Sequence, residues 1–480
     1  MKHLTWTKSL VVLLVLAFTL VALAACAAPT AAPTTAPVPA PTTAPAPAPT
    51  TAAAATPTTA AAKPTEAPKP TEAPKPTEAK PVTLRWYMRW DQVRIDGVAK
   101  PIIEAYQKQY PNVKIEFENV GSGTDYWIKL QTMIAGGTAP DVIYPATHNA
   151  YALATKNALV YVDDFAKRDG IDLTKYDPAV ADLYKTNNKL HCLPIDSAAV
   201  AVFYNKDMFA AAGIAAPKEG WTWDDFLAAA QKLTKDTNGD GKNDQFGVDT
   251  WTSYWPVIVW SKSGHYTFDD PRKPTKFLMD DAAIDAIQWL GDLTNKHHVM
   301  PSSAERANIT DMFLAGKAGM QIIGHWRIPQ YQTVKDFKWD IAPLPMGKAQ
   351  VNRADGSCFA ITAQSKVPEE AWRFVKFLAG PDSMGVNMLL DLQQMVPALT
   401  DYQKSDRFLK PVALPGVNKL PLLLGKGNLF SMYDPLTPNY DEIATAEGAE
   451  LGEVWNGKAT AKEAVGRLVS KINDILAKTK

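Results

Sequence analysis

The stretch 236–247 reads DTNGDGKNDQFG and contains the residue types and spacing of a calcium-binding loop. Its D-x-N-x-D-G pattern matches the first half of an EF-hand loop, and Gly241 stands where the sharp turn is needed. The loop offers five oxygen ligands: Asp236, Asn238, Asp240, Lys242 through its carbonyl group, and Asp244. Gly247 occupies the position of the bidentate Glu, so a remote carboxylate or water must complete the shell. The alternative is an Asx-rich turn whose side chains cap their own backbone.

Two further patterns are weaker candidates for chemistry. The segment GSGT at 121–124 lacks the third glycine of G-x-G-x-x-G and the lysine of a P-loop, so it indicates a turn or helix cap. The pair His297 and His298 is adjacent, and adjacent side chains on a helix point about 100° apart. No HExxH or G-x-S-x-G motif occurs. These observations favour a binding protein over a metalloenzyme or serine hydrolase.

The N-terminus has the pattern of an export signal. Lys2 and Lys8 precede an apolar run from Leu10 to Leu23, and Ala24-Ala25-Cys26 follow. The letters LAAC resemble the lipobox of bacterial lipoproteins, which implies a signal peptide over 1–25 and a lipidated Cys26. The alternative is an uncleaved membrane anchor, but such an anchor usually needs about 20 apolar residues.

Residues 26–80 predict a disordered tether. They consist largely of Ala, Pro, Thr, Lys and Glu, and KPTEAP at 63–68 repeats at 69–74 and, with one change, at 75–80. No large apolar residue follows Val38, so this segment cannot bury a core. A proline-rich spacer extends by about 3 Å per residue, which gives a reach on the order of 150 Å.

The composition limits the classes of partner. The chain has 50 basic and 50 acidic residues, and removal of Lys2 and Lys8 with the signal leaves 48 against 50, a net charge of −2. This balance argues against a nucleic-acid partner. The remaining 400 residues, 81–480, exceed one typical core and predict two domains or lobes. Cys192 and Cys358 remain after lipidation, and in an exported protein they either form a disulfide or stay as buried thiols.

The first part of the folded region alternates strands and helices. Strands are predicted at 82–90, 113–120 and 139–146, and helical spacing of apolar residues appears between them. This order indicates an α/β lobe with a mostly parallel sheet, in which ligands bind beyond the carboxyl ends of the strands. Trp90, Asp91 and the segments 121–124 and 147–149 follow these strands directly.

Seven segments in order resemble one family. They are IIEAYQKQYPNVKIEFENV, LQTMIAGGTAPDVIY, LPIDSAAVAVFYNKDMF, GWTWDDFLAAAQKLT, MFLAGKAGMQIIGHW, GSCFAIT and NGKATAKEAVGRLVSKINDIL. Together they span nearly all of 81–480 and are similar to the extracellular solute-binding proteins of ABC importers, the group that includes maltose-binding proteins. The resemblance implies a two-lobed α/β fold of the periplasmic-binding-protein type, with a hinge between the lobes and the ligand in the cleft.

The resemblance also implies the lobe boundaries. Lobe 1 would comprise 81–195 and 345–400, and lobe 2 would comprise 196–344 and 401–480. Crossings are expected near 192–200, 339–345 and 397–401. Because Cys192 and Cys358 would then lie near the same hinge, the resemblance slightly favours their pairing. The loop at 236–247 would lie in the second lobe, away from the cleft, so its role would be structural.

A sugar ligand needs hydrogen-bonding carboxylates or amides and flat aromatic surfaces for its C–H faces. The candidate ligand-binding residues are Trp90, Asp91, His148, Asp196, Ser197, Trp255, Trp326 and Tyr433. Trp90 and Asp91 follow the first strand. By resemblance, Asp196 occupies the place of a sugar-binding carboxylate in the family and Trp326 that of a stacking aromatic.

The sequence therefore predicts a monomeric, lipid-anchored receptor on the outside of the cell that binds a mono- or oligosaccharide. It would pass the ligand to ABC permease subunits after hinge closure, perform no chemistry and require no cofactor, with calcium as an optional structural ion. One alternative is a non-sugar ligand such as glycerol phosphate or a peptide, since Arg89, Arg94 and Arg327 lie near the cleft. Another is a surface protein that binds or hydrolyses carbohydrate.

Overall fold

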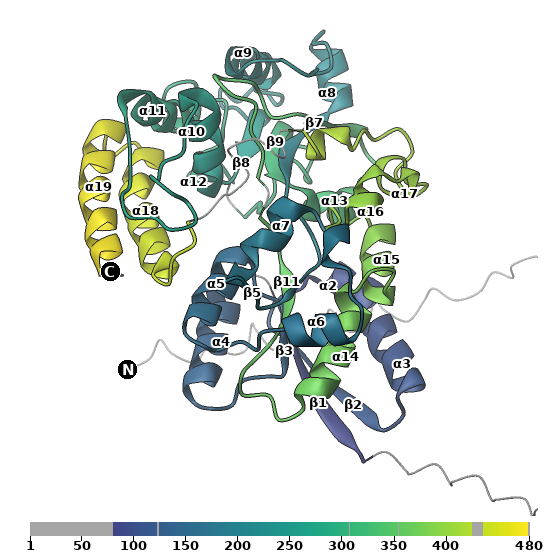
Figure 1. Cartoon of the computed structure of the whole chain (residues 1–480). Helices are drawn as coiled ribbons and strands as arrows, with labels where there is room; N and C mark the ends of the chain where they lie inside the picture. Colours follow the sequence, from purple (N-terminus) through teal and green to yellow (C-terminus); the bar gives the residue numbers. More distant parts are fainter. Residues whose placement is uncertain (1–79, 122–123, 307, 354, 425–434, 479–480) are drawn as a thin grey trace, which may run out of the picture. The chain divides into compact units, whose positions relative to one another are not determined.

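The computed structural model describes residues 80–121, 124–306, 308–353, 355–424 and 435–478 (Figure 1). The predicted signal peptide, Cys26, nearly all of the tether and the candidate Tyr433 lie outside these residues. Within the described ranges, no helix has the length and apolar character needed to cross a membrane.

The first sheet has five strands in the order β2-β1-β3-β11-β6. The strands are β1 (Val82–Met88), β2 (Val113–Asn119), β3 (Val142–Ile143), β6 (Leu193–Pro194) and β11 (Cys358–Ile361). β1 runs parallel to β2 and β3, whereas β11 runs antiparallel to β3 and β6. β1, β2, β3 and β6 therefore run in one direction, as expected for a mostly parallel sheet, and β11, which joins late in the chain, runs opposite to them.

Helices pack around this first sheet, and we call the whole unit lobe 1. They are α3 (Lys100–Gln109), α4 (Thr124–Ala135), α5 (Thr147–Thr155), α6 (Asp163–Arg168), α7 (Pro178–Leu183), α14 (Pro368–Ala379) and α15 (Met384–Asp391). In α3, Ile102 and Tyr106 are four residues apart and fully buried, as helical spacing of apolar residues requires. Short elements complete the lobe: α2 (Gln92–Arg94), η1 (Ile95–Ala99), η2 (Leu173–Lys175), β4 (Lys185–Thr186) and β5 (Lys189–Leu190).

The second sheet has four strands in the order β10-β7-β9-β8. The strands are β7 (Val200–Asn205), β8 (Phe246–Thr250), β9 (Ala318–Gly324) and β10 (Trp339–Ala342). β7 runs antiparallel to β9 and β10, and β8 runs parallel to β9. Every residue of β7, β8 and β9 is buried, including the polar Asp249 and Gln321, which explains why these strands do not alternate between apolar and polar residues.

The second sheet and its helices form lobe 2. The helices are α8 (Lys206–Ala211), α9 (Trp223–Leu233), α10 (Trp255–Ser263), α11 (Asp281–Asn295), α12 (Ser303–Arg306), α13 (Ile328–Tyr331), α18 (Tyr440–Trp455) and α19 (Ala461–Ala477). A capping box between Thr222 and Asp225 starts α9, and α18 and α19 pack against α11. The remaining short helices are η3 (Thr252–Tyr254), η4 (His325–Arg327), α16 (Thr400–Lys404), α17 (Asp406–Leu409) and η5 (Leu420–Leu422).

The chain passes between the two sheets at the places expected from the sequence. It runs from β6 to β7 across 195–199 and returns from β10 to β11 across 343–357. A third segment lies beside the first, since the backbone N–H of Ser197 donates to the Val396 carbonyl at 2.8 Å and that of Ala398 donates to the Ile195 carbonyl at 3.2 Å. The sheets thus divide the strands as expected, while the residue boundaries of the lobes stay a prediction.

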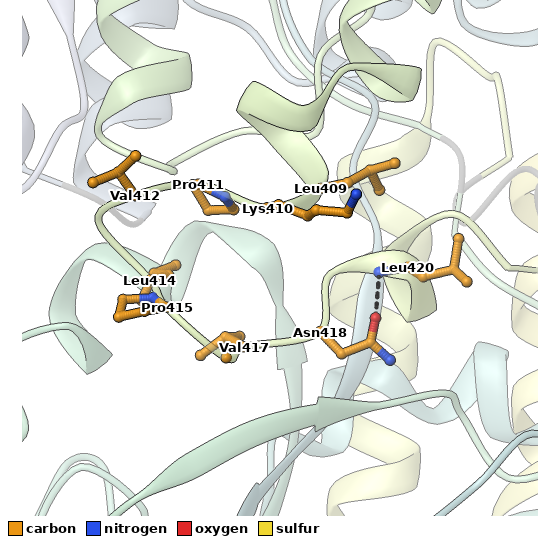
Figure 2. A pocket seen from close by; sticks show the side chains of 10 residues that line it. Leu409, Lys410, Pro411, Val412, Leu414, Pro415, Val417, Asn418 and Leu420 are labelled. Atoms are coloured by element: carbon orange, nitrogen blue, oxygen red, sulfur yellow. Dashed lines mark hydrogen bonds between the residues drawn. The ribbon is translucent and has the colours of Figure 1, made fainter.

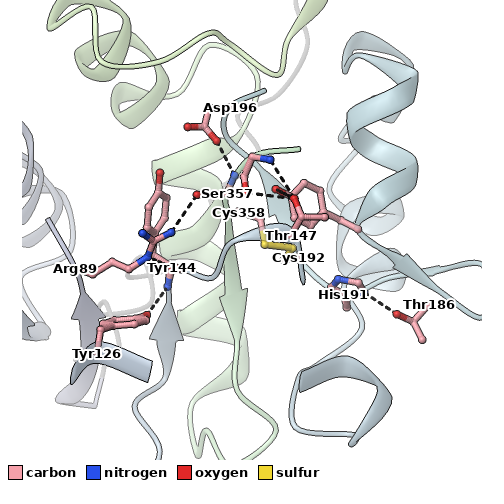
Figure 3. The surroundings of a disulfide bond; sticks show 12 residues. Arg89, Tyr126, Tyr144, Thr147, Thr186, His191, Cys192, Asp196, Ser357 and Cys358 are labelled. Atoms are coloured by element: carbon pink, nitrogen blue, oxygen red, sulfur yellow. Dashed lines mark hydrogen bonds between the residues drawn. A yellow bond between two sulfur atoms is a disulfide. The ribbon is translucent and has the colours of Figure 1, made fainter. Parts of the chain in front are cut away.

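A disulfide lies beside these connections (Figure 3). It joins Cys192, the residue directly before β6, to Cys358 at the start of β11. Both side chains are fully buried. The bond spans 166 positions of sequence, which include all four strands of the second sheet. Of the two alternatives left open by the sequence, the structure has the disulfide.

Candidate functional site

A cavity of about 610 Å³ is lined by residues of both lobes. This volume falls within the range of about 300–1,000 Å³ that is typical of small-molecule sites. The lining residues are Arg89, Asp91, Arg94, Trp127, Tyr144, Ala146, His148, Asn149, Asp196, Ala198, Trp251, Ser253, Tyr254, Trp326, Arg327, Gln330, Arg353, Gly356, Ser357, Gln394 and Tyr440. Most of them follow β1, β3, β8 and β9 or lie on the connections between the sheets, whereas Trp127 lies on α4 and Tyr440 at the start of α18.

Three tryptophans supply flat surfaces to this cavity. Trp251 follows β8 directly and is 42% exposed, and its ring lies parallel to that of Tyr254, with centroids 6.0 Å apart. Trp326 and Trp127 are half-buried. A Cβ at Gly324 would lie 2.1 Å from the ring of Trp326, so only glycine at this position lets the indole take its place. These surfaces suit the apolar faces of a ring-shaped ligand.

Asp196 lies at the first connection between the sheets. Its side chain is buried, and its Oδ1 accepts a hydrogen bond from the backbone N–H of Ser357 at 2.6 Å (Figure 3). The other oxygen lies 3.6 Å from Nε2 of His325, whose Nδ1 accepts from the Ala199 N–H. A Cβ at Gly356 would meet the Asp196 carbonyl oxygen at 2.2 Å, so this close approach requires glycine. The carboxylate is therefore held in one orientation at the cavity wall.

Asp91 makes a direct contact between the lobes. It caps α2 by accepting from the backbone N–H of Arg94 at 3.0 Å, and it pairs with the Arg94 guanidinium at 2.8 Å. Its Oδ2 also accepts from Nε2 of Gln330 at 2.7 Å, and Gln330 belongs to α13 of lobe 2. Burial alone would raise the pKa of Asp91, but Arg94 and these hydrogen bonds hold the pKa below its ordinary value. Asp91 thus stays ionised as an acceptor.

Most of the arginines that line the cavity are paired with acids. Arg94 pairs with Asp91, Arg327 with Asp311, and Arg353 with Asp355. Arg89 differs from these three.

Among the described residues, no carboxylate lies within ion-pair distance of Arg89. Its Nε donates to the Tyr144 carbonyl at 3.4 Å and its terminal nitrogen to Ser357 Oγ at 3.5 Å, and both contacts are long (Figure 3). The guanidinium also lies over the rings of Trp127 and Tyr144 at 5.4 Å. Burial lowers the pKa of Arg89. This guanidinium can donate hydrogen bonds to a ligand or pair with a negative charge on it.

Several polar atoms at the cavity lack a partner. Asn149 Oδ1, Gln330 Oε1 and Arg327 Nε are buried and make no hydrogen bond within the part of the chain that the structure describes. Buried polar atoms are normally hydrogen-bonded. Two acceptors and one donor in residues that line the cavity are thus unpaired, although none of these three atoms is exposed to solvent.

The structure brings four of the eight candidate residues into the cavity wall: Asp91, His148, Asp196 and Trp326. The ring of His148 stacks on that of Tyr440 from α18, with centroids 3.9 Å apart. Tyr433 lies outside the described residues.

Trp90, Ser197 and Trp255 do not line the cavity, which corrects three expectations. Trp90 is 1% exposed and packs edge-on against Trp86 in the core of lobe 1. Ser197 is fully buried, and Trp255 is buried at the start of α10. At Trp90 and Ser197 the backbone is extended, and successive side chains in extended backbone point to opposite sides. The residues before and after each of them therefore line the cavity instead.

Several lining residues were not predicted from the sequence: Trp127, Tyr144, Trp251, Tyr254, Arg353, Gln394 and Tyr440. Trp251 could have been found, because it follows β8 as Asp91 follows β1 and both strands have a parallel neighbour. Arg353 lies on the return connection, and no local pattern marks it. Gln330, which also lines the cavity, lies in α13, and α13 follows β9 and η4.

The loop 236–247 lies outside this cavity, and its carboxylates bond to its own backbone. Both oxygens of Asp236 accept from backbone amides, of Gly239 and Gly241, at 2.7 Å. Asp240 accepts from the Lys242 N–H at 2.9 Å, and Asp244 accepts from the Thr237 N–H at 2.8 Å. The amide of Gly241 lowers the pKa of Asp236.

Among the described residues, no group of three or more His, Cys, Asp or Glu side chains is placed to hold a metal ion. The hydrogen bonds of the loop, that of Asn238 included, are those of an Asx-rich turn, and calcium binding by this loop stays a prediction.

The chain matches the family model described as bacterial extracellular solute-binding protein over residues 92–385, which is more than half of its length. The chain belongs to this family. It is an extracellular solute-binding protein of the ABC importer type, as the sequence predicted, and the family's extracellular character implies export. The members of the family are binding proteins.

Individual relatives are similar over most of this solute-binding protein. The arabinooligosaccharide-binding protein of Bacillus subtilis is 26% identical over 292 residues, which cover 58% of this chain and 66% of the relative. The sn-glycerol-3-phosphate-binding periplasmic protein of Escherichia coli K12 is 23% identical over 364 residues, which cover 71% and 80%.

A solved structure shares the fold of the chain. It is an ABC substrate-binding protein of Listeria monocytogenes in complex with cycloalternan, with a TM-score of 0.73 and 21% identity. The match covers 83% of this chain and 100% of the other. The predicted two-lobed α/β fold is thereby confirmed.

Proposed function

We propose that this solute-binding protein captures a sugar or oligosaccharide in the cavity between its lobes and delivers it to the permease of an ABC importer. The observation that carries the proposal is the joint presence of partly exposed indoles, Trp251 and Trp326, and the Asp196 carboxylate in one cavity. The Bacillus subtilis relative is named for arabino-oligosaccharides and the Listeria monocytogenes structure contains cycloalternan, and both support a carbohydrate ligand.

Recognition follows from the chemistry of the wall. The C–H faces of a sugar ring pack on the indoles, and hydroxyl groups placed opposite Asp196 donate to its carboxylate. Hydrogen bonds to an ionised acceptor are stronger than those between neutral groups. A ligand that lacks hydroxyls at these positions would leave buried acceptors unpaired and bind weakly.

Delivery depends on closure of the lobes. Because lobe 1 contributes Asp91 and His148 while lobe 2 contributes Trp251 and Trp326, a bound ligand contacts both. It therefore binds the closed state more tightly than the open one and shifts the population towards closure. The closed form then docks on the permease, which hydrolyses ATP. Small-angle scattering should show a smaller radius of gyration with ligand, and an unchanged radius would contradict this mechanism.

Binding is tested by calorimetry on the mature chain and an Asp196→Asn variant. A sugar library first identifies a ligand. We expect the variant to bind it about 10- to 100-fold more weakly, because a hydrogen bond to a charged group contributes about 1.5–3 kcal/mol. Unchanged affinity would remove Asp196 from the site, and release of product from an oligosaccharide would indicate a hydrolase.

The proposal includes anchoring through a lipid on Cys26, with residues 26–80 as the tether, and a monomeric protein that performs no chemistry. Replacement Cys26→Ser should release the protein from the membrane fraction of the producing cell, since a single lipidated residue is the proposed attachment. Retention of the variant in that fraction would indicate an uncleaved anchor.

Arg89 favours a second candidate ligand, an anionic solute such as glycerol phosphate. It is the cavity arginine without a carboxylate partner among the described residues, and a phosphate would supply the missing charge. One relative is named for sn-glycerol-3-phosphate. Titration of wild type and Arg89→Gln with glycerol 3-phosphate decides between the two. Binding that the variant loses supports the anionic ligand, whereas no binding to wild type leaves the sugar.

A further inference from the structure

A second cavity of about 620 Å³ adjoins the first, and both are lined by Trp251 and Ser253. It lies in lobe 2, between the segment that follows β8 and the C-terminal ends of α11 and α18. Its volume is similar to that of the first cavity and within the range of about 300–1,000 Å³ for small-molecule sites. Because Trp251 and Ser253 belong to both linings, a chain-like ligand that extends past Trp251 can reach a second site of comparable size.

The side chains of the second cavity resemble those of the first in kind, but they carry less charge. Trp455 lies half-buried at the end of α18, and Asn295, Ser302 and Asn456 provide amide and hydroxyl groups. The lining includes one charged side chain, Arg306, whose guanidinium pairs with the buried Asp249. A neutral surface of aromatic, amide and hydroxyl groups suits uncharged sugar units better than ions.

Two side-chain amides that line this cavity use their nitrogen as a hydrogen-bond donor and leave their oxygen without a donor from the described residues. Asn456 donates its Nδ2 to the Gly452 carbonyl at 2.8 Å, and Asn295 donates its Nδ2 to the Val454 carbonyl at 3.0 Å. Within the described part of the chain, no protein donor reaches the Oδ1 of either residue. The amides are thus oriented by the end of α18, and their oxygens can accept from ligand hydroxyls.

Trp251 connects the two sites. Its indole is 42% exposed although tryptophan is usually well buried, and the neighbouring Tyr254 ring lies parallel to it with an angle of 2° between the planes. The exposed ring belongs to the walls of both cavities. It can therefore lie under a sugar unit that passes from one site to the next.

We propose that the second cavity is an additional saccharide site, so that the protein prefers an oligosaccharide long enough to span both cavities. This inference rests on the proposed function, because it assumes that the first cavity holds a sugar. It adds the length of the ligand and assigns Trp455 and Asn456 to its recognition.

The test is calorimetry of the mature chain with two probe series, arabinose to arabinohexaose and maltose to maltohexaose. In the series that binds, wild type should show a rise in affinity of about tenfold or more beyond a certain length, as further units reach Trp251 and the second cavity. Trp455→Ala and Asn456→Ala should remove that rise while affinity for the shortest bound probe stays unchanged. Asp196→Asn should weaken all lengths equally.

Trp221→Ala is the matched control, because Trp221 is also half-buried and lies outside both cavities. Asn456 is exposed, so its replacement tests the site without disturbing the core should Trp455→Ala unfold the protein. Equal affinities at all lengths, or a length dependence unchanged in both variants, would overturn the inference and leave the proposed function intact. If no probe in either series binds wild type, the inference falls, whereas the carbohydrate ligand is decided by the sugar library of the binding test.

Discussion

Single positions in extended segments decide which side chains face the ligand cavity. Arg89 and Asp91 line it, whereas Trp90 between them packs in the core of lobe 1. In the same way Asp196 and Ala198 line the cavity and Ser197 does not. Placing a residue after a strand is therefore insufficient to assign it to the site, since the neighbouring residue points the other way.

Gly324 should control the aromatic surface of the cavity. A Cβ at this position would meet the ring of Trp326 at 2.1 Å, so Gly324→Ala forces the indole to move. We expect a loss of sugar affinity of about tenfold, similar to the loss on Trp326→Ala, because the same stacking surface is removed. Calorimetry with a bound sugar measures the effect.

Gly448→Ala serves as the control for this change. Gly448 lies inside α18, and a Cβ there meets no atom within 4 Å. The control should bind normally and melt at the same or a slightly higher temperature, because alanine favours helix over glycine. Unchanged affinity of Gly324→Ala would show that Trp326 is not held in a ligand-binding position.

Lys419 should make stability depend on pH. It is fully buried, its Nζ donates to Gln393 Oε1 at 2.6 Å, and burial lowers its pKa to about 7. An unfolded chain keeps this proton up to about pH 10.4, so between these values the unfolded state binds more protons. The group therefore adds stability as the pH rises from about 7 to about 10.

Replacement Lys419→Met removes this dependence. The variant should be more stable than wild type near pH 6, where the folded protein must bury an ammonium group, and the advantage should shrink towards pH 10. Denaturant midpoints across this pH range measure the difference. Parallel curves for the two proteins would show that the buried amine keeps its ordinary pKa.

At the scale of elements, the ends of strands and the starts of helices position the site. β1 and β8 each have a parallel partner and lead directly to cavity residues, Arg89 and Asp91 in one case and Trp251 in the other. Asp91 has a structural and a site role, because it caps α2 and its carboxylate, at the cavity wall, accepts a hydrogen bond from Gln330 of α13. The local signals for caps and strand ends thus coincide with functional positions.

The loop 236–247 should keep its structure without calcium. The oxygens of Asp236 are used by the amides of Gly239 and Gly241, and both glycines have positive φ, 79° and 85°, as this tight turn requires. We expect the melting temperature to be the same in excess EDTA and in millimolar calcium. A rise in calcium that Asp240→Ala abolishes would show that the loop binds the ion after all.

At the scale of the whole molecule, the disulfide links the two points where the chain enters and leaves lobe 2. Cys192 and Cys358 are separated by 166 positions. Cys192 directly precedes β6 and Cys358 begins β11, and both strands belong to the sheet of lobe 1. The bond therefore leaves lobe 2 free to move on its connections. In the unfolded state it keeps residues 192 and 358 together and so reduces the conformational freedom of the chain.

Loss of this disulfide should destabilise the protein with little effect on ligand affinity. The double variant Cys192→Ser with Cys358→Ser should unfold about 2–5 kcal/mol more easily, since the unfolded chain regains its freedom. Denaturant titration measures the change, and wild type in reducing agent should match the variant. A large loss of affinity in the folded variant would instead mean that the bond positions Asp196.

The sequence by itself determined much of this protein. The seven family segments indicated the fold, the family and the approximate positions of the connections, and Asp91, His148, Asp196 and Trp326 were identified as cavity residues. These features depend on local spacing and on the order of elements, which a single sequence records directly.

Only the tertiary structure decided the rest. The cavity forms where segments more than 200 positions apart meet, as in the contact of Asp91 with Gln330, and no local pattern encodes such a meeting. The partners of an arginine are equally non-local, so the difference between Arg89 and its paired neighbours became visible only in the fold. The same holds for Trp251, whose exposed ring lies beside the cavity between the lobes and beside the second cavity in lobe 2.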